Sequence, residues 1–428
     1  MSKSLVRVIA LAGISILFYT GSSNATAWTH YNTENSSLPY DKVLTIAQDH
    51  IGSIWCGTMQ GEVCRLVGND WISFSVSSSV YSMVIDAENI KWIGARLSAE
   101  GIGYGTLIRM AHYETEYFKQ DNSGYPGGNA FSVAIDNNGH KWIGTGGKAV
   151  VRYDSQNDLW NYWKVPGGWE VKSIAVDGSD NSIWVGTEGY GAARFTVEDD
   201  FEFFNSSYTP KGFVSNYITC VFIDSSGDKW FGSYGGVSRL RSNGDWSIYD
   251  ISSGLPANRI NTVTEDHNGN IWVGTNSGAA RYNGVSWEVY NTSNSDIPCN
   301  TIFSIFVDLE GAIWFGTDNG ISRFLQQEIN IPEGRVAIQG GHRGYINPAI
   351  GDNAKIIFNP DNSGTVRVKI FTANAHKVWE TSRESNGEQG YVIWDCKNFQ
   401  GRTVSSGVYA VHIEGPGINK FKRIPIVR

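Results

Sequence analysis

The motif Trp-x-Gly occurs seven times at nearly regular intervals, and this repeat limits the possible folds more than any other feature of the sequence. Successive tryptophans are 37, 50, 42, 46, 42 and 42 residues apart. Intervals of this length are typical of the four-stranded blade of a propeller and are too long for leucine-rich or ankyrin repeats. The repeated tryptophans are Trp55, Trp92, Trp142, Trp184, Trp230, Trp272 and Trp314.

Other positions recur with the tryptophan. An aspartate lies six residues before it in six copies, and in the remaining copy Asp177 is displaced by one inserted residue. Three residues before the tryptophan only Gly or Asn occurs, which predicts a tight turn because both residues tolerate positive φ. Each unit therefore reads as an apolar strand, an Asp-initiated turn, a Trp-x-Gly strand and a third strand with an arginine. These arginines are Arg65, Arg109, Arg152, Arg194, Arg239, Arg281 and Arg323.

An aromatic doublet forms the expected outer strand of each unit. No doublet follows Arg323, but one is present near the N-terminus, at Trp28 to Tyr31. The numbers of inner and outer strands match only if this N-terminal strand completes the last blade. The sequence therefore predicts an all-β chain with a seven-bladed β-propeller over residues 28–326, closed by its N-terminal strand.

One repeat carries a family resemblance. Residues 255–282, with Leu255-Pro256-Ala257-Asn258, Asp266-His267-Asn268-Gly269 and Trp272-Val273-Gly274-Thr275, resemble the repeat of two-component-regulator propellers. Such propellers are the periplasmic sensor domains of hybrid histidine kinases, and the resemblance extends over about residues 28–326. It implies a propeller that senses a ligand. Unlike the best-known members, this sequence contains no pattern for a kinase domain.

A different pattern follows the last repeat. We expect a linker over residues 327–347, which contain Pro332 and Gly340-Gly341. Short alternating segments over 348–428 predict a small Ig-like β-sandwich. Residues 390–409 resemble the FlgD-like immunoglobulin-type modules and, more loosely, type IX secretion sorting domains, although Cys396 stands where that family has Gly. The resemblance implies secretion or surface attachment, and the alternative is a stabilising cap.

The first residues indicate export. Lys3 and Arg7 precede an apolar run, and Ala25-Thr26-Ala27 reads as a cleavage site, so residues 1–27 are expected to be a signal peptide. We expect a secreted or cell-surface protein, with the periplasm as the alternative. The net charge of −8, from 34 basic and 42 acidic residues, argues against nucleic-acid binding. Cys56 and Cys64 lie opposite each other on one predicted hairpin, so a disulfide and two free thiols are both open alternatives.

Function is expected where the repeat is broken, around the mouth of the central funnel. Strand order brings two sets of loops to this end, which we call the funnel rim: the loops that lead into each inner strand, and the hairpins that follow Trp-x-Gly. Trp169 lies in the first set, at a position where Asn is the usual residue. We expect it to contact a ligand, and the alternative is that it packs locally. The candidate ligand-binding residues are Trp169, Glu188, Tyr190, Tyr234, Arg96, Asn276 and Asp318.

Aromatic side chains mixed with amides and carboxylates suit a glycan or a peptide. We therefore expect a noncatalytic binding or sensing module that needs no cofactor and no metal, and whose other partners are the secretion machinery or the cell surface. The alternative is a carbohydrate-active or streptogramin-lyase-like propeller enzyme. That alternative needs a base at the funnel rim, where only Tyr190 and Tyr234 are candidates.

Overall fold

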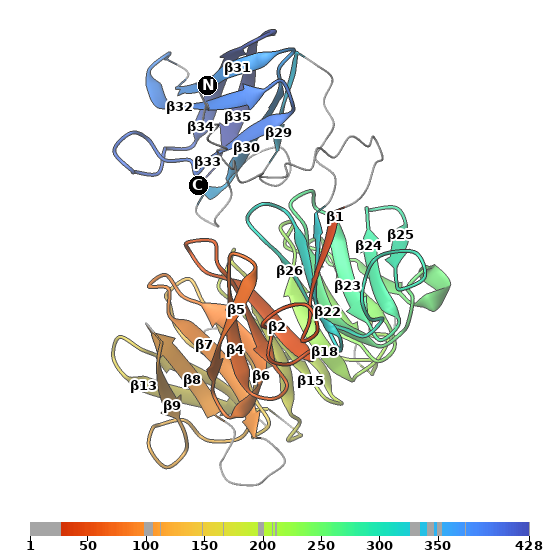
Figure 1. The fold of residues 1–428 in the computed structure, drawn as a ribbon. Coiled ribbons are helices and arrows are strands. Elements are labelled where there is room, and N and C mark those ends of the chain that lie inside the picture. The colour runs from red at the N-terminus through yellow and green to blue at the C-terminus, as the bar shows by residue number, and fades with distance from the viewer. Residues whose placement is uncertain are drawn as a thin grey trace, which may run out of the picture.

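The computed structural model describes residues 27–97, 106–111, 113–147, 149–165, 167–195, 201–207, 209, 212–325, 334–339, 346–348, 353–372 and 374–427. The predicted signal peptide lies outside these residues except for Ala27, as does most of the predicted linker. The described chain is built almost entirely of β-strands, and Figure 1 shows it as a propeller with a separate, smaller β-structure in blue. No helix in this part of the chain has the length and apolar character that crossing a bilayer requires.

Seven four-stranded antiparallel sheets form the seven blades of the propeller. The innermost strands contact one another in a closed ring, in which the last also contacts the first. These inner strands are β2 (Val43–Gln48), β6 (Ser78–Ile85), β10 (Ala130–Ile135), β14 (Val171–Val176), β18 (Ile218–Ile223), β22 (Ile260–Glu265) and β26 (Ile302–Val307).

The second strands carry Trp-x-Gly, and the third strands carry the arginine. The second strands are β3 (Ile54–Thr58), β7 (Lys91–Leu97), β11 (Lys141–Thr145), β15 (Ile183–Thr187), β19 (Lys229–Ser233), β23 (Ile271–Thr275) and β27 (Ile313–Thr317). The third strands are β4 (Glu62–Val67), β8 (Thr106–Ala111), β12 (Ala149–Asp154), β16 (Gly191–Phe195), β20 (Val237–Leu240), β24 (Gly278–Tyr282) and β28 (Gly320–Leu325).

The outer strands include the predicted N-terminal one, so the expected closure is confirmed. Strand β1 (Ala27–Tyr31) pairs antiparallel with β28, and the ring of Trp28 stacks on Phe324 at 4.5 Å between centroids. The other outer strands are β5 (Asp70–Ser75), β9 (Glu114–Phe118), β13 (Leu159–Lys164), β17 (Phe201–Phe204), β21 (Trp246–Tyr249) and β25 (Trp287–Tyr290). A short 3-10 helix, η1 (Ile251–Ser253), follows β21.

The repeated aspartate and tryptophan form one buried unit at the end opposite the funnel rim. In six blades Oδ1 of the aspartate accepts backbone N–H groups of its own turn, as in an Asx cap. Oδ2 of the same aspartate accepts the indole N–H of the tryptophan at 2.7–3.0 Å. The tryptophans are 0–5% exposed, which confirms that they are core residues.

Blade four departs from this pattern because of its inserted residue. Asp177 pairs with Lys229 of the next blade at 2.7 Å, and the indole nitrogen of Trp184 is buried with no hydrogen-bond partner among the described residues. The repeated arginines are structural too: in six blades the guanidinium lies over the tryptophan of its own blade.

The C-terminal strands form two facing sheets around one apolar core. One sheet is β29 (Arg335–Gln339), β30 (Ala354–Asn359) and β33 (Gly390–Trp394), and the other is β32 (Lys377–Asn386), β31 (Ser363–Phe371), β34 (Gly407–Gly415) and β35 (Ile418–Ile426). The predicted linker over 327–347 is therefore wrong in part, because β29 lies within it and pairs with β30. Pro332 and Gly340, on either side of β29 in the sequence, favour a loop, so the alternation of Val336 and Ile338 between them did not suffice to predict a strand.

Two cysteine positions are explained by the backbone. Cys396 is fully buried and has a φ of 57°, so it occupies a left-handed position of the kind that favours glycine. Cys56 and Cys64 face each other across β3 and β4 as expected, and both are buried free thiols. Burial, together with a hydrogen bond to Cys64, raises the pKa of the Cys56 thiol well above its usual value.

Candidate functional site

At the funnel rim, hairpins that follow Trp-x-Gly contact the segment that leads into the inner strand of the next blade. In blade four, Glu188 forms a β-bridge with Tyr217, which precedes β18 of blade five. The amide of Tyr234, in the blade-five hairpin, donates to the carbonyl of Tyr217 at 3.3 Å. Residues of blades four and five are thereby held close together.

Two parallel tyrosine rings lie in the middle of this region. Tyr217 and Tyr234 have ring centroids 5.7 Å apart and planes 4° from parallel, and they are 48% and 43% exposed. The guanidinium of Arg259, which directly precedes β22, lies 4.8 Å from the ring centroid of Tyr234. Arg259 is exposed and makes no hydrogen bond or ion pair with any other described residue. The guanidinium is therefore available to an anionic or hydrogen-bonding group of a ligand.

A half-buried cation links the carboxylates of blade four. Nζ of Lys172 on β14 lies 2.6 Å from Glu170 Oε2 and 2.8 Å from Glu188 Oε2, and it sits 3.9 Å above the ring of Phe131. The hydrogen bond from Lys172 lowers the pKa of Glu188, and the positive charge of Arg259 lowers it further. Burial by itself lowers the pKa of Lys172, but the two carboxylates raise it overall.

Trp169 covers the hairpin of blade four. A Cβ added to Gly189 would stand 2.7 Å from Cζ3 of Trp169, and Gly189 has a φ of +128°. The glycine thus provides both the backbone conformation and the space for the ring. The ring remains 36% exposed, so Trp169 both packs locally and presents a surface beside Glu188.

The other predicted residues are distributed differently. The ring of Tyr190 meets Phe203 of the outer strand β17 edge-on at 5.2 Å. Asn276 accepts a hydrogen bond from Asn261 at 2.8 Å, and Asp318 pairs with Lys42 at 2.9 Å. Arg96 is exposed on β7. Their participation in ligand binding stays a prediction.

The structure thus brings together three of the predicted residues, Trp169, Glu188 and Tyr234, with four that the sequence reasoning missed. We call the following set the blade 4–6 site: Trp169, Glu170, Lys172, Glu188, Tyr217, Tyr234 and Arg259. The missed signal for Glu170, Tyr217 and Arg259 lies one residue after the position of Trp169 in each repeat, where all seven residues differ. That position reads Lys42, Ser79, Asn129, Glu170, Tyr217, Arg259 and Thr301.

The blade 4–6 site combines exposed aromatic rings with a guanidinium and carboxylates. Exposed ring faces offer contact area, and a guanidinium with carboxylates offers orientation. The described histidines of the propeller lie elsewhere: His30 is on β1, and His50, His140 and His267 are in turns at the opposite end. Within the described ranges, no cluster of three or more His, Cys, Asp or Glu side chains could hold a metal ion.

Comparison with known proteins supports the propeller architecture. Residues 254–277 match the two component regulator propeller family. No curated protein matches the sequence. The extracellular domain of a protein described as a hybrid two-component system, BT3049 from B. thetaiotaomicron, is similar in structure with a TM-score of 0.60 and 22% identity, over 94% of this chain and 58% of that one.

Two other solved structures have similar folds. PorZ, a surface component of the type-IX secretion system of Porphyromonas gingivalis, has a TM-score of 0.55 and 17% identity, over 91% of this chain and 60% of that one. The chain thus spans less than two thirds of PorZ and of the BT3049 domain. Virginiamycin B lyase from Staphylococcus aureus has a TM-score of 0.58 and 15% identity, over 71% of this chain and 100% of that one. Identities this low establish the fold alone.

Proposed function

We propose that the protein is an exported, noncatalytic module that binds an extracellular ligand, a glycan or a peptide, at the blade 4–6 site. The observation that carries this proposal is the parallel pair Tyr217 and Tyr234, each nearly half exposed, with the guanidinium of Arg259 against one ring. Large exposed rings in a fixed arrangement are favourable for binding because little side-chain entropy is lost when a ligand covers them.

The charged groups beside the tyrosines would set orientation. A sugar ring against the exposed parts of Tyr217 and Tyr234 would have hydroxyl groups near Glu188 and Arg259, which can accept and donate hydrogen bonds respectively. A peptide would use the same groups for its termini or polar side chains. The Lys172 ammonium and the Arg259 guanidinium together balance the carboxylates of Glu170 and Glu188, so the site carries no net formal charge.

The C-terminal sandwich is proposed to direct the protein to its destination. Its support is the resemblance of residues 390–409 to FlgD-like and type IX sorting modules, and the structural similarity of 91% of the chain to PorZ, a surface component of the type-IX secretion system. The left-handed backbone at Cys396 fits the glycine that the FlgD-like family has there.

A lyase is the second candidate, favoured by the similarity of the propeller to virginiamycin B lyase. A catalytically inactive histidine-to-alanine variant of that lyase has been solved with quinupristin. The blade 4–6 site contains no histidine, so a reaction there would depend on a tyrosine or a carboxylate as base.

Binding and product release, measured together on a panel of polysaccharides and peptides, separate the two candidates. For any ligand that binds, Tyr234→Phe keeps the ring and removes the hydroxyl. The binding proposal expects affinity within about threefold of the parent and no product from either protein, since the ring supplies the contact area. Product release that disappears in Tyr234→Phe or Tyr190→Phe would establish the lyase instead.

A further inference from the structure

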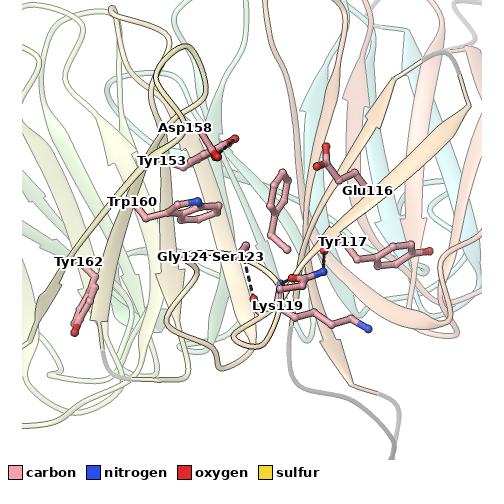
Figure 2. A pocket seen from close by; sticks show the side chains of 11 residues that line it. Glu116, Tyr117, Lys119, Ser123, Gly124, Tyr153, Asp158, Trp160 and Tyr162 are labelled. Carbon is pink, nitrogen blue, oxygen red and sulfur yellow. Dashed lines mark hydrogen bonds between the residues drawn. The ribbon is translucent and has the colours of Figure 1, made fainter.

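A concave site separate from the blade 4–6 site lies on the outer perimeter of the propeller, between β9 of blade two and β13 of blade three. Figure 2 shows this pocket, which has a volume of about 870 Å³. Both strands are the outermost of their sheets, and none of the blade 4–6 residues lines the pocket. Its size is within the range of small-ligand sites.

The floor of the pocket is a set of rings that hold one another in place. Tyr153 and Trp160 stack at 4.1 Å between centroids, with planes 19° apart, and Phe118 lies 5.3 Å from Tyr153 and 5.4 Å from Trp160. Gly124 fits against Trp160 so closely that an added Cβ would stand 2.5 Å from Cδ1 of the indole. The rings are therefore ordered before any ligand arrives.

Two carboxylates stand over this aromatic floor. Asp158 Oδ1 accepts the hydroxyl of Tyr153 at 3.1 Å, and Oδ2 has no partner among the described residues. Glu116 lies 3.6 Å from Arg109, which is a long ion pair. Burial, then Asp158 and Glu116, raise the pKa of Tyr153 to about 12, so both carboxylates act on this hydroxyl and it stays protonated.

The positive lining residue is at the other end of the pocket. In Figure 2 Asp158 and Glu116 lie at the top, whereas Lys119 lies at the bottom with its ammonium group directed away from Trp160. Nζ of Lys119 is 5.9 Å from the ring of Tyr117. Because Arg109 offsets Glu116, the part of the pocket above Trp160 is aromatic and its remaining negative charge is that of Asp158.

We propose that this pocket binds an organic cation, a guanidinium or alkylammonium group, between the aromatic floor and the carboxylates of Asp158 and Glu116. Aromatic faces attract cations through their quadrupole, and nearby carboxylates add a charge interaction. Such a group is supplied either by a basic side chain of a peptide or by a small free amine.

The test uses the full chain and two pairs of probes that differ in charge but hardly in shape. N-acetyl-arginine amide is compared with N-acetyl-citrulline amide, and choline with 3,3-dimethylbutanol, by saturation-transfer NMR titration. We expect at least one cation to bind about fivefold or more tightly than its neutral counterpart. A preference for the arginine compound indicates a peptide source, and a preference for choline indicates a free amine.

Asp158→Asn is the decisive variant. Asp158 has a φ of 52°, and asparagine tolerates this conformation well, so the turn should persist. We expect the variant to weaken cation binding about three- to tenfold. Glu202→Gln is the charge control, because it removes the same single negative charge from the outer strand of blade four, outside the pocket. Equal binding of cations and neutral probes, or equal loss in both variants, would overturn the proposal.

Discussion

Tyr217 and Tyr234 come from successive elements of blade five, yet their rings lie within 4° of parallel at the funnel rim. The hydrogen bond from the Tyr234 amide to the Tyr217 carbonyl fixes this arrangement through the backbone. Because the backbone holds the two residues together and both side chains are more than 40% exposed, the pair is a preformed surface rather than part of the core.

The first prediction concerns the buried Asp–Trp units. Trp230→Phe removes the donor that satisfies Asp224 Oδ2, whereas Trp184→Phe removes an indole nitrogen that already lacks a partner in the described structure. We expect Trp230→Phe to lower the free energy of unfolding by about 1–3 kcal/mol more than Trp184→Phe. Urea denaturation of both variants measures the difference. Equal losses would show that the hydrogen bond does not stabilise the blade.

The second prediction concerns closure by β1. A chain that begins at Asn32 lacks the strand that pairs with β28 and the Trp28 ring that stacks on Phe324. We expect its unfolding free energy to be at least about 2 kcal/mol below that of a chain that begins at Ala27. Val285→Ala serves as a control for a surface change, since Val285 is 89% exposed. An unchanged denaturation midpoint would mean that blade seven does not need β1.

The third prediction follows from the Lys172–Glu188 ion pair. The pKa of Glu188 is depressed below 4.5 in the folded protein, chiefly by its hydrogen bond from Lys172. Its contribution to stability is therefore present above pH 4.5 and is lost as the pH falls through the folded-state pKa. The melting temperatures of the parent and Glu188→Gln should differ near pH 7 and converge toward pH 3. A difference that stays constant with pH would exclude this pairing.

The fourth prediction separates the two parts of the chain. The core of the sandwich draws on residues from Val336 to Ile426 and on none from the propeller. Deleting residues 327–428, which removes β29 with the rest of the sandwich, should leave the melting of the propeller and its ligand affinity nearly unchanged. Cell fractionation should show a changed destination. Unchanged localisation would reduce the sandwich to a stabilising cap.

The repeat made the propeller predictable, because turn residues and core tryptophans recur at fixed offsets in all seven copies. The C-terminal strands were harder to predict. β32 is largely polar and half-exposed, so its sequence lacks a clear alternation of apolar and polar residues. β29 lies between a proline and a glycine, which predict a loop rather than a strand. Cys396 departs from a family glycine, and only the backbone angle shows that the glycine conformation is kept.

The site was only partly predictable for a different reason. Comparing one loop position across the repeats singled out Trp169, but the next position, with Tyr217 and Arg259, is equally close to the hairpins. Tyr190 has the same rim location by strand order as Glu188, yet its ring turns toward Phe203 on the outer strand. Side-chain direction within a hairpin is set by packing with neighbouring strands, which a repeat alignment does not contain.

The most direct test of the account is the effect of removing the Tyr234 ring on the affinity for a polysaccharide or peptide that the full chain binds. Isothermal titration calorimetry should show at least about a tenfold weaker affinity for Tyr234→Ala. Tyr113→Ala should bind like the parent, because Tyr113 is also an exposed tyrosine stacked on a ring, Phe74, but lies at the end opposite the funnel rim. Unchanged affinity in Tyr234→Ala, with both variants folded, would contradict ligand binding at the blade 4–6 site.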